Sequence, residues 1–510
     1  MKDFNVLLFY PNEPMVGIVP SNLAILSACL KESGFNVKLF DCTTYRSVTG
    51  ETQEDTRTKL GLVKKTDIDK YIHLKETNIY EDFVEIVDEY KPDLIAFTVV
   101  DSTIKFSLSF VGLIKNKNIP IVFGGVGATF NYEKILNAGM EDFMKGCALV
   151  DFVCIGEGEE AIVELCEELF RGNACENIKN IYCRNLYSGN IIKNPLRKLV
   201  NLEDLPTPDF SIYEDWRFYR PFMGKVKRML QMDFDRGCQH GCTYCAAPGL
   251  RKVFIDENCG RYYRVKSNDK IFQEMKYLID KYRLDFVWIS SETLLDLPLE
   301  KFREFVERYK KEINLPMWCQ SRLDTFTEEK TKLLAELGCE NVSIGLEHGS
   351  EEIRKKILNK HISNKVIIDA VKLMAKYRIF PTFNNMLGLP DETRENVFET
   401  VQLNRELSSI LNGKHNLNVF TFIPFMGTKL RQICIDKGYI KDNEEIPASF
   451  FKESMLDMPT MSKAEIKGLE KTLALYIMLP ETYYPDIKLA EQDNEEGTKK
   501  FNELINLIKK

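Results

Sequence analysis

Residues 235–245 read Asp-Arg-Gly-Cys-Gln-His-Gly-Cys-Thr-Tyr-Cys, a stretch that places the thiols of Cys238, Cys242 and Cys245 close together. Soft thiolate ligands suit iron–sulfur clusters, and gaps of three and then two residues allow three sulfurs to converge on one cubane. The fourth iron of such a cubane keeps no protein ligand. Glycines at 237 and 241 give the backbone room to wrap around a bulky group. The stretch therefore predicts a [4Fe–4S] cluster bound by these three cysteines.

Zinc is the main alternative metal for this stretch. A structural zinc site takes four ligands, and His240 is too close in sequence to the cysteines to complete the same tetrahedron easily. A chance grouping of three cysteines is a weak explanation for this stretch, because side-chain packing does not account for their spacing. Several other cysteines of the fourteen stand singly inside apolar stretches, which is typical of small buried side chains. These are Cys29, Cys154, Cys166, Cys339 and Cys434.

The cysteine stretch follows an apolar run that predicts a β-strand, and an alternation of strands and helices continues after it. The predicted strands are 229–234, 286–290, 317–321, 341–346, 382–387 and 417–422. The predicted helices between them are 269–282, 299–313, 328–337, 350–358, 364–377 and 394–407. Six such units indicate a partial (β/α)6 barrel over residues 225–430. The cysteines then lie at the carboxyl end of the first strand, the face where barrel enzymes carry their chemistry.

Residues 1–178 also alternate short strands with amphipathic helices, which favours an α/β domain with a doubly wound, parallel, Rossmann-like sheet. Such a sheet binds ligands beyond the carboxyl ends of its strands, at the topological switch point. Prolines punctuate residues 179–224, which predicts an extended connector between domains. Residues 431–510 are mostly polar apart from one apolar helix at 466–478, and we expect them to form a helical cap.

Composition indicates a globular protein of two or three domains, because 510 residues exceed one ordinary core. Hydrophobic residues make up 44% and charged residues 28%, and the formal net charge is -7. Nothing in this charge pattern points to a nucleic-acid partner. No apolar stretch reaches the roughly 18 residues that span a bilayer, and the amino terminus lacks the pattern of a secretory signal. We therefore expect a cytoplasmic protein without a membrane span.

The C-x-x-x-C-x-x-C spacing, with the aromatic Tyr244 before the last cysteine, resembles the radical S-adenosylmethionine (SAM) superfamily. The resemblance implies that the amino and carboxylate groups of SAM chelate the open iron. It also implies an electron donor, such as flavodoxin or ferredoxin. The electron passes into the sulfonium of SAM and releases a 5′-deoxyadenosyl radical.

Positions downstream of the cysteines extend the resemblance. Ser290, Ser291 and Glu292 match a Gly-Gly-Glu position that binds the SAM amino group, although both glycines are replaced. The resemblance implies further contacts to SAM from Ser321, Arg322, Glu347 and Asn385. Without the cysteines, the charged residues among them would be explained as solvated loop side chains. A Pro-x-x-Gly-Thr match at residues 424–428 is interpreted as structural.

The order of motifs before the barrel resembles the cobalamin-binding domain that precedes many radical SAM barrels. The motifs are Thr98-Val-Val-Asp-Ser102, the glycine turn 124–127 and Gly156-Glu-Gly-Glu159. The resemblance implies cobalamin contacts from Thr98, Ser102, Gly124, Gly125, Gly127, Glu157 and Gly158. Classical cobalamin domains carry Asp-x-His-x-x-Gly, whose histidine binds cobalt, and none of the five histidines lies in that pattern. Cobalamin would then bind without a histidine lower ligand. Alternatively, the domain no longer binds cobalamin.

The leading hypothesis from the resemblance is a cobalamin-dependent radical SAM methyltransferase that acts on an unactivated carbon of a small-molecule or natural-product substrate. The strand ends of the two domains would enclose one cavity. A radical rearrangement, ring contraction or oxidative cyclisation with the same cofactors is one alternative. Another is a cobalamin carrier or sensor with an inactive barrel, which the intact cysteines argue against. Methylthiolation of tRNA is disfavoured, because Cys29 and Cys42 lack the spacing of an additional cluster.

Overall fold

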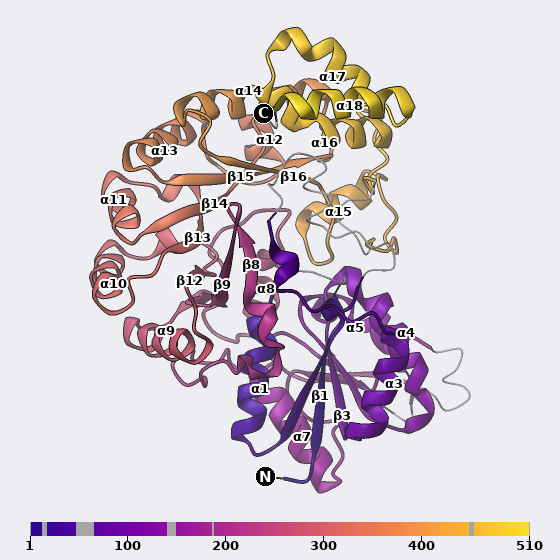
Figure 1. Ribbon diagram of the computed structural model, residues 1–510. Helices are drawn as coiled ribbons and strands as arrows, with labels where there is room; N and C mark the ends of the chain where they lie inside the picture. The colour runs from indigo at the N-terminus through magenta and orange to yellow at the C-terminus, as the bar shows by residue number, and fades with distance from the viewer. Residues whose placement is uncertain are drawn as a thin grey trace.

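The computed structural model describes residues 2–12, 18–46, 66–139, 149–185, 188–447 and 453–508. Two α/β units lie side by side, the amino-terminal one in indigo and purple and the barrel-like one in magenta and orange (Figure 1). The carboxyl-terminal helices, in yellow, lie at the end of the barrel-like unit. One continuous cluster of buried apolar side chains reaches through all three parts and includes Leu8, Leu230 and Leu469. The units therefore share a core.

The amino-terminal unit is a sheet with helices on both faces. Its parallel strands are β1 (Asn5–Tyr10), β2 (Asn36–Asp41), β3 (Leu94–Thr98), β4 (Ile121–Gly124) and β5 (Phe152–Cys154). They run in the order β2-β1-β3-β4-β5, so the winding reverses between β1 and β3. One face carries α1 (Ser21–Glu32) and α7 (Glu159–Arg171). The other carries α3 (Ile79–Tyr90), α4 (Ile104–Ile114) and α5 (Val126–Asn137). The predicted doubly wound sheet is confirmed.

Residues 181–193 differ from the extended connector that the sequence predicted. They form β6 (Ile181–Arg184) and β7 (Ile191–Lys193), which extend the sheet beside β5 as antiparallel strands. Buried asparagine side chains hold this addition in place. Asn180 Nδ2 donates to the carbonyl oxygen of Ile155 at 2.8 Å, and Asn194 Nδ2 donates to that of Ile181 at 2.7 Å. These two asparagines therefore satisfy backbone groups at the edge of the sheet.

The second unit is a curled sheet that begins with an antiparallel hairpin of β8 (Tyr219–Phe222) and β9 (Lys225–Met232). The parallel strands after β9 are β12 (Phe286–Ile289), β13 (Met317–Ser321), β14 (Cys339–Glu347), β15 (Phe380–Leu387) and β16 (Asn416–Thr421). In the part of the chain that the structure describes, β9 and these strands pair in sequence order. The partial (β/α)6 barrel is confirmed.

Helices cover the outer face of the curled sheet (Figure 1). They are α9 (Asn268–Tyr282), α10 (Leu299–Glu312), α11 (Glu328–Glu336), α12 (Glu351–Lys356), α13 (Asn364–Tyr377) and α14 (Arg394–Ile410). The sequence did not predict α8 (Ala246–Asp256), which begins directly after the third cysteine. Pro248 and Gly249 disfavour a helix interior, but here they lie in the first turn, where proline lacks only an unneeded N–H.

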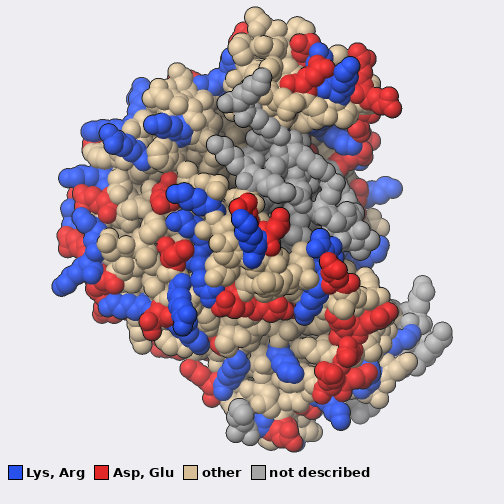
Figure 2. Space-filling view, in the orientation of Figure 1, with Lys and Arg blue, Asp and Glu red and all other residues tan. Residues whose placement is uncertain are grey.

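The carboxyl-terminal segment is the expected helical cap. Its helices are α15 (Lys429–Asp436), α16 (Lys463–Met478), α17 (Tyr484–Ala490) and α18 (Glu495–Ile508). α16 contacts α14 and β16 and buries Ile466, Leu469 and Leu473, which share one helix face. None of the helices described here is long and apolar enough to cross a membrane. On the face shown in Figure 2, acidic and basic side chains are interspersed, in keeping with the near balance of 76 acidic and 69 basic residues.

Glu470 on α16 allows a test of how the cap packs on the barrel. Burial raises the pKa of Glu470 to about 7 from 4.5, and its Oε1 has no hydrogen-bond partner among the described residues. The unfolded chain releases this proton at a lower pH than the folded chain, so the group costs stability as the pH rises from about 4.5 to 7.

We therefore expect Glu470→Gln to raise the melting temperature at about pH 8, where the gain in folding free energy is roughly 1–3 kcal/mol. At about pH 5 the same variant should melt closer to the wild type, since the folded wild type then carries a protonated, neutral carboxyl. Melting followed by circular dichroism at the two pH values checks this. An equal shift at both would contradict the assignment.

Candidate functional site

The loop that carries the three cysteines (the cluster loop, residues 237–245) is anchored on both sides. It follows β10 (Asp235–Arg236), which pairs with β11 (Arg264–Val265), and it leads into α8. Gly237 has φ of +82°, and a Cβ there would lie 2.5 Å from the carbonyl oxygen of Tyr262. Only glycine fits this close approach, so the start of the loop is held against the segment that precedes β11.

The three thiols have different surroundings. Cys242 is buried, and Arg322 Nη1 donates to its Sγ at 3.6 Å. Cys245 Sγ accepts a hydrogen bond from the Ala247 N–H at 3.4 Å, at the start of α8. Burial raises the pKa of the Cys238 thiol, and it raises that of Cys245 to about 12. These two thiols therefore keep their protons until a metal replaces them.

The donor set suits a cluster better than a single ion. Each thiolate of a cubane site binds a different iron, so a loop with three thiols and no close fourth ligand suits a cluster. Three thiols on one glycine-containing loop fit a [4Fe–4S] cluster in their chemistry and in the freedom of their backbone.

Tyr244 ties the cluster loop to β14. Its hydroxyl donates to Glu347 Oε1 at 2.9 Å, and the buried Lys360 Nζ donates to the same oxygen at 3.0 Å. Glu347 has φ of +68° where the register of β14 shifts. A Cβ at Gly345 would lie 1.9 Å from Glu347 Oε1, so a side chain there would displace the Glu347 carboxylate. Tyr244 and Glu347 thus lie together, with one carboxylate oxygen engaged by the protein itself.

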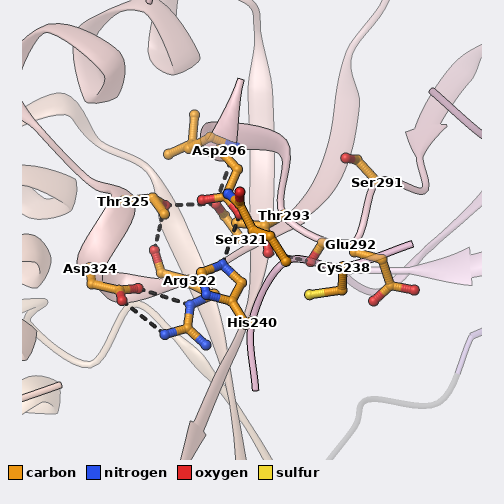
Figure 3. Close-up of polar contacts among 12 residues, drawn as sticks. Cys238, His240, Ser291, Glu292, Thr293, Asp296, Ser321, Arg322, Asp324 and Thr325 are labelled. Atoms are coloured by element: carbon orange, nitrogen blue, oxygen red, sulfur yellow. Dashed lines mark hydrogen bonds and ion pairs between the residues drawn. The ribbon is translucent and has the colours of Figure 1, made fainter. Parts of the chain in front are cut away.

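Ser321 and Arg322, at the end of β13, lie beside the cluster loop (Figure 3). Arg322 Nε and Nη2 donate to Asp324 at 3.0 and 2.8 Å, which leaves Nη1 directed at Cys242. Ser321 is buried, and its Oγ lies 3.1 Å from Thr325 Oγ1. Arg322 therefore faces the cluster loop, whereas Ser321 contacts the turn after its own strand.

Two side chains that the sequence did not identify as site residues also hold the cluster loop. Asp296 Oδ2 lies 2.8 Å from His240 Nε2, and the Arg251 guanidinium donates to the carbonyl oxygen of Gln239 at 2.7 Å. His240 is thereby tied to a carboxylate on the turn after β12. The zinc alternative, which needs a fourth ligand near the cysteines, gains no support from the position of this imidazole.

Ser290, Ser291 and Glu292 follow β12 and point in different directions. Ser291 is fully buried, and its Oγ donates to Asp235 Oδ2, while the Glu292 N–H donates to Asp235 Oδ1 at 3.4 Å. Burial raises the pKa of Glu292 and raises that of Asp235 to about 7. Figure 3 shows the Glu292 carboxylate beside Cys238 and Ser291 turned away from both. Of the three residues, Ser290 and Glu292 line a cavity.

This cavity, of about 410 Å³, lies between the two units. Apolar side chains of the amino-terminal sheet line one part of it: Leu8, Leu23, Leu26, Ala96, Val122 and Ile181. Polar side chains at the barrel mouth line another part: Gln231, Asp233, Asp235, Arg236, Ser290 and Glu292. The predicted cobalamin contacts that line it are Thr98, Gly124, Gly125, Glu157 and Gly158. Ser102 and Gly127 are buried or packed nearby but do not form its lining.

The glycine turn after β4 has a packing reason of its own. Gly125 has φ of +99°, and a Cβ there would lie 2.7 Å from the carbonyl oxygen of Val99. A Cβ at Gly127 would lie 2.5 Å from the carbonyl carbon of Val100. Both glycines therefore let α5 begin close to the end of β3, which brings two strand ends to the same edge of the cavity.

Arg236 joins the cluster loop to the amino-terminal unit. Its Nη1 lies 3.3 Å from Glu157 Oε1, and its Nη2 lies 2.5 Å from Glu159 Oε1. Arg264 Nη1 and the Val200 N–H contact Glu157 Oε2 at 3.2 and 3.1 Å. Burial opposes ionisation of Glu157, but the two arginines outweigh it and hold its pKa below the usual range. The sequence identified Glu157 but missed both arginines, although Arg236 directly precedes the cluster loop.

Asn385 is not among the residues that line the cavity. Its Oδ1 accepts a hydrogen bond from Asn404 Nδ2 of α14 at 2.9 Å, and its Nδ2 donates to the carbonyl oxygen of Asn418 at 3.3 Å. The fully buried side chain thus faces α14, on the outer side of the curled sheet. The predicted contact of this side chain with SAM has no support, because strand alternation directs Asn384 inward instead, where it donates to Ser343 Oγ at 2.9 Å.

The fold and site define a class of protein in which the strand ends of an open α/β sheet face a thiol-bearing loop at the mouth of a partial barrel. The family model for the Radical SAM superfamily matches residues 232–403, and that for the B12 binding domain matches residues 61–166. The chain is a radical SAM enzyme with an amino-terminal B12-binding domain, and its cofactors are a [4Fe–4S] cluster, SAM and cobalamin.

Known proteins resemble the chain at low identity. An uncharacterized methyltransferase of Pyrococcus horikoshii is 26% identical over 370 residues, which is 71% of this chain and 73% of that protein. The anaerobic magnesium-protoporphyrin IX monomethyl ester cyclase of Cereibacter sphaeroides is 24% identical over 362 residues, which is 67% of this chain but only 54% of that protein. The structure of the radical SAM methyltransferase TsrM of Kitasatospora setae, with cobalamin and a [4Fe–4S] cluster bound, matches with a TM-score of 0.60. That match, at 18% identity, covers 86% of this chain and 75% of TsrM, and it supports the fold.

Gly158 allows a test of whether the cavity takes up cobalamin. A Cβ at Gly158 would lie 3.6 Å from Cys154 Sγ, so the position accepts a small side chain but a larger one enters the cavity. We expect Gly158→Leu to weaken cobalamin binding roughly tenfold or more through overpacking. Titration followed by the visible spectrum of bound cobalamin measures this. Gly112→Leu, on α4 with open space around its Cβ, is the control. Unchanged affinity in Gly158→Leu would contradict the assignment.

Proposed function

We propose that the chain methylates an unactivated carbon of a small-molecule substrate, using methylcobalamin as the methyl source. The main support is one cavity lined by the strand ends of both units, with the cluster loop at its edge. When bound, the cluster and SAM supply a 5′-deoxyadenosyl radical, and cobalamin supplies a methyl group. The methyltransferase names of the Pyrococcus horikoshii relative and of TsrM support the same reaction type.

The side chains at the barrel mouth suit the two charged ends of SAM. Cys238, Cys242 and Cys245 would hold the cluster. Glu292 presents its carboxylate at the cavity wall, and such a group favours an ammonium group such as the SAM amino group. Arg322 has one guanidinium edge fixed by a neighbouring carboxylate and the other directed at the cluster loop, where it can bind the SAM carboxylate.

The segment after β16 packs at the junction of the two units. A Cβ at Gly249 of α8 would lie 2.2 Å from the carbonyl oxygen of Gly427, and Phe130 of α5 packs on the same glycine. Asp101 accepts a hydrogen bond from the Met426 N–H at 2.8 Å. The segment after β16 thus closes against both α8 and the amino-terminal unit. A closed junction protects a carbon radical from side reactions, as methyl transfer requires.

A second candidate function uses the same cofactors without methyl transfer. The similarity to the anaerobic cyclase of Cereibacter sphaeroides favours this alternative, which is an oxidative cyclisation. A cobalamin carrier with an inactive barrel is disfavoured, because it has no need for three thiols on one loop. An electron donor such as flavodoxin or ferredoxin stays a prediction.

Cys242→Ala tests whether the cluster loop supports SAM cleavage. After anaerobic reconstitution with iron and sulfide, we expect the wild type to show the visible absorbance of an iron–sulfur cluster and to form 5′-deoxyadenosine from SAM with a reductant. Cys242→Ala should lose both, because two thiols do not retain the cubane. Cys259→Ala, which removes another buried thiol near the loop, should retain both. Cluster absorbance in Cys242→Ala at the wild-type level would disprove the assignment.

The fate of the methyl group separates the two reaction types. We would incubate the reconstituted protein with SAM carrying an isotope-labelled methyl group and with pools of small-molecule substrates. Methylation predicts a product that is heavier by one labelled CH2 unit, whereas oxidative cyclisation predicts an unlabelled product that has lost hydrogen. Mass spectrometry of the products distinguishes them. An unlabelled product would overturn methyl transfer.

A further inference from the structure

Asp235 binds two consecutive residues of the turn after β12. Its Oδ2 accepts a hydrogen bond from the Ser291 hydroxyl, and its Oδ1 accepts one from the Glu292 N–H at 3.4 Å. Ser291 is fully buried, and Asp235 is only 6% exposed. Both carboxylate oxygens of Asp235 are thus engaged by the turn that carries Glu292 to the cavity.

Asp235 is itself held on both sides. In β10 it pairs with Val265 of β11, and the next residue, Arg236, is ion-paired with Glu157 and Glu159 of the amino-terminal unit. The cluster loop begins directly after Arg236. One dipeptide therefore connects the turn after β12, the cluster loop and the amino-terminal unit. Movement of this turn relative to the loop requires breaking the bonds to Asp235.

Ser291 stands where the Gly-Gly-Glu pattern has its second glycine. A glycine has no hydroxyl, so it would leave Asp235 Oδ2, a buried acceptor, without the bond seen here. Asp235 likewise supplies the acceptor that a buried serine hydroxyl needs. The two residues therefore form a matched pair, and the departure from the glycine pattern has a physical reason in this chain.

We propose that Asp235 and Ser291 are positioning residues that fix Glu292 beside the cluster loop for binding the amino group of SAM. The inference rests on the proposed function, in which Glu292 binds that group. Neither Asp235 nor Ser291 contacts SAM in this proposal. Loss of the pair lets the turn move, so the affinity for SAM falls while the cluster and cobalamin stay bound.

The test measures SAM binding to the full-length protein reconstituted with cluster and cobalamin. SAM is titrated into the reduced protein, and the change in the EPR spectrum of the cluster gives the dissociation constant. We expect Ser291→Ala and Asp235→Ala each to raise this constant roughly tenfold, because each variant removes a buried hydrogen bond that holds the turn. KM for SAM in 5′-deoxyadenosine formation should rise by a similar factor, with a smaller change in kcat. Iron and cobalamin contents should match the wild type.

Ser27→Ala is the matched control. Ser27 on α1 is also fully buried, and its hydroxyl donates to Asp209 at 2.8 Å, away from the cavity lining. This variant should lower the melting temperature without changing SAM binding. If Ser291→Ala lowers the melting temperature but leaves the dissociation constant unchanged, the pair is merely structural and the proposal is overturned.

Two further outcomes keep the inference separate from the proposed function. If Ser291→Ala does not fold, Asp235→Ala decides, because it removes both hydrogen bonds to the turn. Wild-type affinity for SAM in that variant overturns the proposal. If SAM changes neither the spectrum nor the products of the wild type, the proposed function itself fails. If the wild type responds to SAM and the variants differ from it only in a higher dissociation constant for SAM, both the proposed function and the inference are supported.

Discussion

The ion pairs between Arg236, Glu157 and Glu159 connect the cluster loop to the strand ends of the amino-terminal sheet. The side chains of these two glutamates are only 16% and 6% exposed, and carboxylates that are buried to this degree need a cation close by. Arg264 supplies a second cation to Glu157. Loss of Arg236 or Arg264 while the units stay packed would leave these buried carboxylates with fewer partners. The ion pairs therefore hold the two halves of the site together.

The contacts around these ion pairs keep the two units close together at the cavity. Gly237 brings the start of the cluster loop against Tyr262, and Gly125 and Gly127 bring α5 against the end of β3. The cavity between the two units has a polar wall formed by the barrel mouth and an apolar wall formed by the amino-terminal sheet. A ligand that spans the cavity would touch both units. The arrangement suits an enzyme whose two cofactors must act on one substrate, and neither unit alone encloses that space.

The sequence predicted most of the fold, because apolar runs and helical periodicity are local signals. The strand Met317–Ser321 was predicted with the bounds that the structure has, and its buried positions alternate with partly exposed ones. α8 was missed because Pro248 and Gly249 count against a helix unless its start is known. β6 and β7 were missed because their pairing depends on a distant strand.

The candidate site was predictable where one short motif carries it. The cysteines, Tyr244 and Glu292 belong to such motifs. The contact of Asn385 with SAM stays a prediction from the family resemblance, and in the structure its side chain is bonded to Asn404 and Asn418. Arg236 and Asp235 were missed because their partners lie 79 and 56 residues away, at Glu157 and Ser291, and no local pattern joins them.

The magnetic interaction between the two cofactors tests the account most directly. The full-length protein would be reconstituted anaerobically with iron, sulfide and cobalamin, then reduced so that the cluster and cobalt are both paramagnetic. Because both groups face one cavity that spans the two units, the account predicts an EPR spectrum with splitting or broadening from their mutual interaction. A spectrum equal to the sum of two isolated centres would contradict it.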